Sequence, residues 1–256
     1  MPTAGIPRRD SRIPKNIFQT FETFDLKPGM ILARQTWIDQ NKDYTVYFQD
    51  KNHRLETVAM AGQELGGAIF ARNLISAYNG LTSGALKADI WRYCALFLFG
   101  GVYADIDSIC LVPLQDVLRD DDEFVSSCAG QVRWAIFNGF IASRPRHPFL
   151  ARSIVRAERE IRWGERDGYL ATGPGNLGMA VNEVIGRHRK TVFESGDFDR
   201  YRLFRKINKS VFDGDVKIVL TEYDTYLDDL SAAGIKHWTK LRKGTPILQR
   251  IRRRFV

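Results

Sequence analysis

Cysteine and long apolar runs are both scarce in this chain of 256 residues. The three cysteines, Cys94, Cys110 and Cys128, are unclustered, which fits neither a disulfide framework nor a zinc site. The longest apolar run is Cys94 to Phe99, far shorter than the roughly 20 residues that cross a bilayer. The first ten residues contain no apolar signal core. We therefore expect a reduced protein that resides in the cytoplasm.

Acidic residues are absent after Asp229. Eight of the 38 Lys and Arg residues follow that position, which leaves 30 to balance the 30 Asp and Glu residues before it. The net charge of +8 thus belongs to a basic tail on a neutral domain. A nucleic-acid-binding domain should carry its positive charge on its own surface, so we expect no nucleic-acid partner.

The tail, residues 241–256, is predicted to be a basic amphipathic helix. Pro246 is well placed to begin it. Four apolar residues share one helical face and arginines occupy the others; the apolar residues are Ile247, Leu248, Ile251 and Phe255. Such a helix suits an anionic membrane surface. Docking of its apolar stripe on the domain is the alternative.

Segments with strand and helix patterns alternate in the first half of the chain, which favours a parallel sheet with crossover helices. Expected strands cover 13–21, 44–48, 102–104, 123–129, 135–143 and 215–220, and expected helices cover 28–40, 66–78, 82–99 and 147–163. No internal repeat or low-complexity linker divides the chain. We expect a flexible leader over 1–12, one domain over 13–240 and the tail over 241–256.

Two aspartates, Asp105 and Asp107, follow the short apolar strand that ends at Ala104. Residues i and i+2 of a strand project the same way, so both carboxylates should point to one place. The carboxyl end of a parallel strand is where α/β sheets bind ligands. Two carboxylates with water or phosphate oxygens suit Mn²⁺ or Mg²⁺. The spacing alone also fits a solvated turn.

The helix before the aspartates has one charged face. Asp89, Arg92 and Tyr93 share that face because they are three and four residues apart. A local ion pair on a solvated face would explain this spacing. The helix is otherwise so apolar, however, that little of it should meet solvent, and a charged face on it favours contact with a polar ligand.

The stretch ALKADIWRYCALFLFGGVYADIDSICLVPL, residues 85–114, closely resembles the D-x-D region of family 32 glycosyltransferases. These include bacterial polysaccharide and lipopolysaccharide sugar transferases and the yeast initiating mannosyltransferase. Weaker matches are IPKNIFQTFE, FNGFIASRPRHPF, YLATGPGNL and GIKHWTK. The resemblance implies a single α/β domain of the GT-A type, Rossmann-like, with a mostly parallel central sheet. It also implies a nucleotide-diphosphate sugar as donor.

For the metal site, the resemblance implies that Asp105 and Asp107 hold Mn²⁺ or Mg²⁺ and orient the donor diphosphate. His237 matches a late metal ligand of such enzymes. That match is loose because the Ser-Trp that usually follows is missing, and a surface histidine is the alternative.

For the substrates, the resemblance implies that Asp89 and Arg92 contact the donor sugar and its ribose or phosphates. With Asp105 and Asp107 they form the implied catalytic set. Phe21 stands where the family has a base-stacking Trp, and Phe18 replaces a His, so no polar role is expected of it. The remaining implied contacts are Tyr103 and Asn138 on the donor side, and Asn138, Thr172 and Gly173 on the acceptor side.

These observations predict a metal-dependent, retaining hexosyltransferase. Its acceptor would be a glycan or a lipid-linked molecule in the synthesis of cell-surface polysaccharide or lipopolysaccharide. It would act in the cytoplasm, and on the inner face of the membrane if the tail binds lipid. One alternative is a metal-dependent phosphatase, which Ser108 and Ile109 fit poorly. Another is a non-catalytic basic adaptor for membrane or nucleic acid.

Overall fold

The computed structural model describes residues 12–130, 132–165, 167–199 and 201–235. The predicted tail helix over 241–256 lies outside these residues, as does nearly all of the predicted leader. No helix in the described ranges is both long and apolar enough to cross a bilayer.

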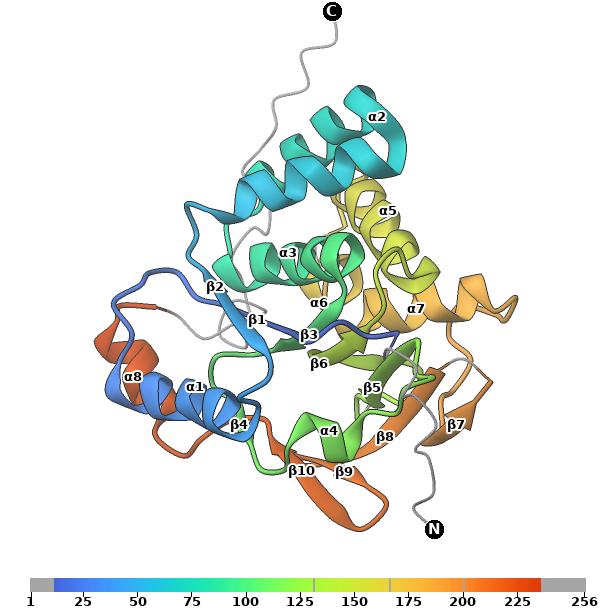
Figure 1. Ribbon diagram of the computed structural model, residues 1–256. Coiled ribbons are helices and arrows are strands. Elements are labelled where there is room, and N and C mark those ends of the chain that lie inside the picture. Colours follow the sequence, from blue (N-terminus) through green and yellow to red (C-terminus); the bar gives the residue numbers. More distant parts are fainter. Residues whose placement is uncertain (1–11, 131, 166, 200, 236–256) are drawn as a thin grey trace, which may run out of the picture.

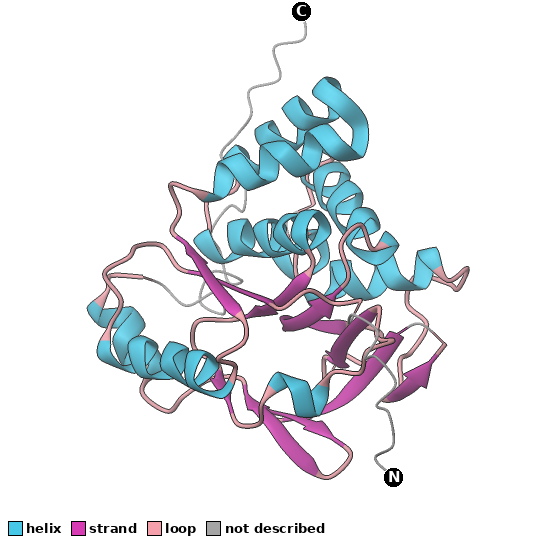
Figure 2. Ribbon diagram, in the orientation of Figure 1, coloured by secondary structure: helices cyan, strands magenta, loops and turns pink. Residues whose placement is uncertain are grey.

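A curled sheet forms the centre of the domain (Figures 1 and 2). Its strands are β1 (Asn16–Thr20), β2 (Thr45–Gln49), β3 (Gly101–Ala104), β4 (Ile109–Cys110), β5 (Phe124–Cys128), β6 (Ile136–Ser143), β7 (Gly196–Phe198), β8 (Tyr201–Ile207), β9 (Ser210–Asp213) and β10 (Val216–Leu220). They are arranged in the order β2-β1-β3-β6-β5-β8-β9-β10-β4, and β7 pairs with β8.

The sheet is mixed, so the expected mostly parallel arrangement is wrong. Three of the nine strand pairings within the described ranges are parallel, namely β1 with β2, β1 with β3, and β5 with β8. The other six are antiparallel. Crossover helices follow β1 and β2, whereas short connections join β5 to β6 and β8 to β9 to β10. Short connections allow only antiparallel neighbours.

Helices cover both faces of the sheet. They are α1 (Pro28–Gln40), α2 (Arg54–Gly80), α3 (Gly84–Phe99), α4 (Leu114–Val117), α5 (Pro148–Arg162), α6 (Gly168–Ala171), α7 (Pro174–Val184) and α8 (Tyr226–Ala232). Figure 1 shows α2, α3 and α5 above the sheet and α1, α4 and α8 below it. Alternate residues of β1 divide between the two cores: Phe18 packs on the α3 side and Ile17 on the other.

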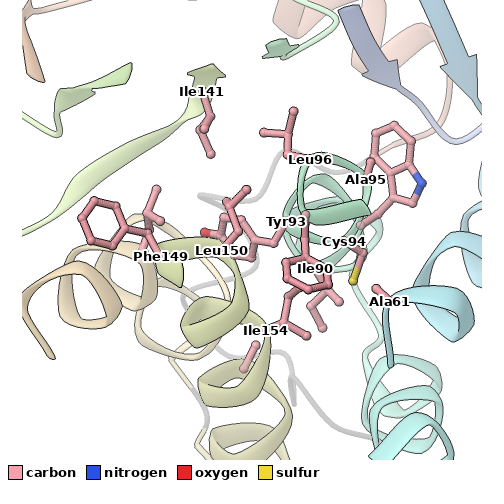
Figure 3. Packing of buried hydrophobic residues seen from close by; sticks show 14 of the residues in the cluster. Ala61, Ile90, Tyr93, Cys94, Ala95, Leu96, Ile141, Phe149, Leu150 and Ile154 are labelled. Atoms are coloured by element: carbon pink, nitrogen blue, oxygen red, sulfur yellow. The ribbon is translucent and has the colours of Figure 1, made fainter. Parts of the chain in front are cut away.

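The larger core lies between α3, α5 and the sheet. Ile90, Tyr93 and Leu96 of α3 gather near Leu150 and Ile154 of α5 in Figure 3. Because these side chains are almost wholly buried, α3 is held in a fixed position against the sheet.

Two glycines end α3 and begin β3. Gly100 has φ +62 and donates its N–H to the Leu96 carbonyl, as in a common helix ending. Gly101 has φ +119, and a Cβ there would lie 2.6 Å from the Asn16 carbonyl oxygen. The predicted glycine stop is therefore confirmed, and it turns the chain from α3 directly into the strand that leads to the aspartates.

The helix α2 turns back on itself. Gly66 and Gly67 have non-helical backbone angles, with φ +69 at Gly67. A Cβ at Gly62 would lie 2.7 Å from the Cα of Ala71, so the two halves pack closely. Figure 1 shows this hairpin at the top of the domain. The predicted helix over 66–78 is its second half.

Candidate active site

Asp105 and Asp107 lie in a tight turn just beyond β3, after the strand as predicted, so the alternation of side chains along a strand does not apply to them. The turn is fixed by its backbone. The Asp105 N–H donates to the Gly139 carbonyl at 2.9 Å, and the Ser108 N–H donates to the Asp105 carbonyl at 3.1 Å. Gln19 of β1 donates to the same carbonyl at 3.5 Å. Three strands thus determine where the first aspartate lies.

The carboxylate of Asp105 already has a cationic neighbour. Its Oδ1 accepts a hydrogen bond of 2.7 Å from the Tyr103 hydroxyl and lies 3.1 Å from Nη1 of Arg92. The same Nη1 donates to the Asn138 carbonyl at 2.7 Å. The guanidinium also lies 4.2 Å from the centre of the Tyr103 ring. Arg92 is therefore the counter-charge of the first aspartate.

Asp107 is in a different situation. No Lys, Arg or His among the described residues forms an ion pair with its carboxylate, whereas Asp105 has Arg92. Burial, and then the charge of Asp105, raise the pKa of Asp107 well above its usual range. A bound cation would relieve both effects. Within the described residues, the one guanidinium of Arg92 therefore faces more carboxylate charge than it can balance.

The donor atoms at this turn fit a hard divalent cation. Two carboxylates are ligands that Mn²⁺ or Mg²⁺ prefers. Within the described ranges no group of three or more His, Cys, Asp or Glu side chains could hold a metal ion. The remaining ligands would have to come from water, from a substrate, or from other parts of the chain. His237, the predicted third ligand, lies outside the described residues.

Asp89 lies on the other side of Arg92. Its Oδ1 accepts a hydrogen bond of 2.8 Å from the Asn138 amide and lies 3.2 Å from Nη2 of Arg92. Its Oδ2 accepts a bond of 3.0 Å from the Thr172 hydroxyl. Burial raises the pKa of Asp89 to about 6, with Arg92 opposing and Asp105 adding to the shift. Three donors therefore hold one buried carboxylate in a single orientation.

The predicted acceptor-side residues join the same network. The Tyr93 hydroxyl donates to the Thr172 carbonyl at 2.8 Å and accepts from the Asn138 amide at 3.1 Å. Gly173 follows as the residue that caps α7. Sequence reasoning gave Tyr93 no specific role. Its spacing of four residues from Asp89 was the available signal.

Phe21 lies close to the aspartate turn but is covered. It is 6% exposed and packs with Met30, Ala33 and Ile106, the residue between the two aspartates. Phe18 lies on the opposite core and stacks on Tyr47 with ring centres 5.2 Å apart.

Sequence reasoning missed two parts of the site. A Cβ at Gly139 would lie 2.3 Å from Oδ2 of Asp105, so only glycine leaves that carboxylate in place. The second part is the segment before α8, where the Tyr223 N–H donates to the Asp107 carbonyl at 3.2 Å. The Asn-Gly pair at 138–139 could have indicated the first part. Only the fold brings the second into contact.

Paired aspartates just beyond a central strand are what the resemblance to D-x-D glycosyltransferases implied. The family comparison agrees. Residues 29–125 match the family described as "Glycosyltransferase sugar-binding region containing DXD motif", and this range contains Asp89, Arg92, Asp105 and Asp107. The predicted resemblance to family 32 glycosyltransferases is confirmed.

Two curated relatives are mannosyltransferases by name. The initiation-specific alpha-1,6-mannosyltransferase of Candida albicans is 36% identical over 114 residues, covering 43% of this chain and 28% of that protein. The mannosyl phosphorylinositol ceramide synthase CSH1 of Saccharomyces cerevisiae is 29% identical over 180 residues, covering 70% of this chain and 43% of that protein. The chain thus spans less than half the length of these relatives.

Solved structures show the same fold. The PaToxG glycosyltransferase superposes with a TM-score of 0.53 at 19% identity, over 68% of this chain and 70% of that chain. The ligand-free glycosyltransferase domain of the YGT toxin gives 0.50 at 10% identity, over 88% of this chain and 86% of that one. At these sequence identities the similarity shows a shared fold and nothing about activity or substrate.

Proposed function

We propose that this protein is a metal-dependent glycosyltransferase that moves a hexose from a nucleotide-diphosphate sugar to an acceptor hydroxyl. The observation that carries the proposal is the charge arrangement on α3 and β3. One buried guanidinium, Arg92, lies between Asp89 and Asp105, and Asp107 beside them has no cationic partner within the described ranges. The family match over these residues supports the same reaction class.

The protein side chains have separate roles in this proposal. Asp105 and Asp107 would hold the Mn²⁺ or Mg²⁺ ion, whose chemistry is to neutralise charge on the leaving diphosphate. Arg92 is fixed by the Asn138 carbonyl and by two carboxylates, so it can stabilise phosphate charge without reorganising. Asp89 would accept hydrogen bonds from sugar hydroxyls and orient the ring.

We further propose transfer with retention of anomeric configuration. Asp89 receives three donors, which suits a positioning role better than attack on the sugar. The other two carboxylates, Asp105 and Asp107, are assigned to the metal ion in this proposal. In a same-face reaction, the bond from the sugar C1 to the diphosphate oxygen breaks and the acceptor oxygen bonds to C1. The acceptor proton passes to the leaving diphosphate.

For the substrates we propose mannose as the first sugar to test, because two curated relatives are named for mannosyl transfer. One of these names includes an inositol-containing ceramide, which supports a lipid-linked acceptor as well as a glycan. A place in the synthesis of cell-surface polysaccharide or lipopolysaccharide is part of the same proposal.

Calorimetric titration of UDP and GDP, with and without Mn²⁺, tests the proposed function. Metal-dependent binding of one nucleotide is expected, and the double variant Asp105→Ala/Asp107→Ala should lose it. The nucleotide that binds then selects the sugar donors for transfer assays. Absence of binding by the unaltered protein to either nucleotide, with metal present, would overturn the proposal.

A further inference from the structure

The loop after β1 is held by an arginine from another element. Arg54, the first residue of α2, has a side chain that is 1% exposed. Its Nε donates to the Thr20 hydroxyl at 2.6 Å, at the end of β1. Its Nη1 lies 2.9 Å from Oε1 of Glu22, whose side chain is 28% exposed. The residue between these two contacts is Phe21.

The same guanidinium also reaches the start of α3. Nη1 of Arg54 donates to the Gly84 carbonyl at 3.3 Å. A Cβ at Gly84 would lie 2.2 Å from Oε1 of Glu22, so the carboxylate rests directly against this glycine. A carboxylate beside the first turn of a helix is also favoured by the helix dipole. Glu22, Arg54 and Gly84, here called the latch, therefore connect three elements.

The connected elements carry the candidate site. The loop after β1 holds Phe21, and α3 carries Asp89 and Arg92 in its second and third turns. Within the described residues, no hydrogen bond or ion pair joins Glu22 or Arg54 to the four proposed catalytic residues, so the proposed reaction gives them no direct role. Burying a charged arginine is costly unless it is paired. Because Arg54 has these partners only when the loop after β1 lies against the start of α3, it stabilises that one arrangement of the two segments.

We propose that the latch fixes the loop after β1 against the start of α3, so that Asp89 and Arg92 are already in place when a nucleotide sugar binds. Glu22 and Arg54 are positioning residues that act through Asp89 and Arg92. This inference rests on the proposed function, because it assigns the donor to these two residues. Without the latch, the loop and the first turn of α3 would have to be ordered by the donor itself, at the expense of its affinity.

Three single variants test the latch. Glu22→Gln removes the charge but keeps the shape. Gly84→Ala keeps Glu22 and Arg54 in the sequence, but its new methyl group pushes the Glu22 carboxylate away. The change should not weaken the helix itself, because alanine is at least as favourable as glycine in a helix. Asp122→Asn is the matched control, because Asp122 pairs at 2.5 Å with buried Arg202 of β8, which β3, β6 and β5 separate from β1 in the sheet. The measurements are the nucleotide Kd with Mn²⁺ and the melting temperature.

Glu22→Gln and Gly84→Ala should each weaken nucleotide binding about tenfold, within the roughly hundredfold cost of a misplaced site. The control should lower the melting temperature and leave the Kd unchanged. Unchanged affinity in Gly84→Ala, or an equal loss of affinity in Asp122→Asn, would overturn the latch.

Hydrogen exchange of the ligand-free protein separates the latch from the proposed function. In Glu22→Gln, exchange should increase in residues 21–27 and also in residues 84–87, because both segments lose the same anchor. An increase confined to the loop would overturn the latch. If the unaltered protein bound no nucleotide, the proposed function would fail, and the exchange result would still decide whether the two segments are coupled.

Discussion

Two buried arginines of this domain have very different neighbours. Arg202 in β8 pairs with one carboxylate, Asp122, through Nε at 2.8 Å and Nη2 at 2.5 Å, and it donates to the Val117 carbonyl. A more exposed Asp213 lies 3.8 Å away. Each charge here has a partner and the geometry is bidentate, as in a pair that serves the fold.

Arg92 in α3 lies instead between Asp89 and Asp105, and it also moderates the charge of Asp107. One guanidinium therefore serves three carboxylates. Its side chain is as well buried as that of Arg202, so burial does not distinguish the two. The balance of charge distinguishes them: among the described residues, two carboxylates lie within 3.2 Å of the Arg92 guanidinium and one within that distance of Arg202.

The largest expected effect comes from exchanging each arginine for lysine. Arg92→Lys should lower nucleotide affinity and transfer by about 100- to 1,000-fold, because a point charge cannot serve two carboxylates and the Asn138 carbonyl together. Arg202→Lys should reduce the melting temperature by several degrees and leave nucleotide affinity unchanged. Calorimetry and thermal unfolding of both variants measure this. If both variants lost nucleotide affinity to the same extent, the Arg92 cluster would not differ from the Arg202 cluster in function.

A smaller effect should separate the two aspartates. Asp107→Asn removes a half-buried charge that has no cationic partner in the described ranges, so the metal-free protein should become more stable by about 1 kcal/mol. Asp105→Asn takes a carboxylate away from Arg92 and should destabilise it by about 1–3 kcal/mol. Denaturant unfolding in a chelator gives both values. Destabilisation by Asp107→Asn would show that its carboxylate has a partner after all. Both variants should lose metal-dependent nucleotide binding.

The smallest effect concerns pH. The pKa of Asp89 is raised to about 6 by burial, so the carboxylate that pairs with Arg92 becomes protonated below that pH. Donor kcat/KM should therefore fall about tenfold for each pH unit below about 6. Because this pKa lies above its unfolded value, ionisation of Asp89 lowers stability as pH rises from about 4 to 6. A pH profile without an inflection near 6 would exclude Asp89 as the titrating group.

His147 supplies the stability control for that profile. It caps α5 by accepting a hydrogen bond from the Phe149 N–H at 3.2 Å, which requires a neutral ring. Burial, and then Arg144, lower its pKa to about 3. Its contribution is complete above about 6.5 and is lost as pH falls toward 3, the opposite sign to Asp89. His147→Asn keeps a capping oxygen and should remove this loss without moving the activity profile.

Local patterns in the sequence were sufficient to predict the positions of α3, of β3 and of the aspartates that follow it. The glycine pair ends the helix, the apolar run is long enough to be buried, and D-x-D follows directly. The strand pair β5–β6 and the helix α5 were predicted for the same reason. The strands β8 and β9 were not predicted, so the hairpins that make this half of the sheet antiparallel were missed. The alternation of apolar and polar residues along β8 and β9 does not specify which strands they pair with.

The site was predicted as a set of residues and not as a network. Thr172 and Asn138 reach Asp89 across 83 and 49 residues of sequence, and no local pattern specifies such contacts. Gly139 shows the same limit, since its importance depends on an oxygen of Asp105. The resemblance named most members of this network. The single guanidinium among three carboxylates emerged only from the fold.

The pairing of β4 with β10 has a consequence for the order of events during synthesis. β4 begins two residues after Asp107, and its sheet partner is β10, where Ile109 faces Leu220. The aspartate turn therefore lacks one of its two flanking supports until more than a hundred further residues have left the ribosome. Contacts of such sequence separation form late in folding. The nascent chain can therefore complete the aspartate turn only after β10 has been synthesised.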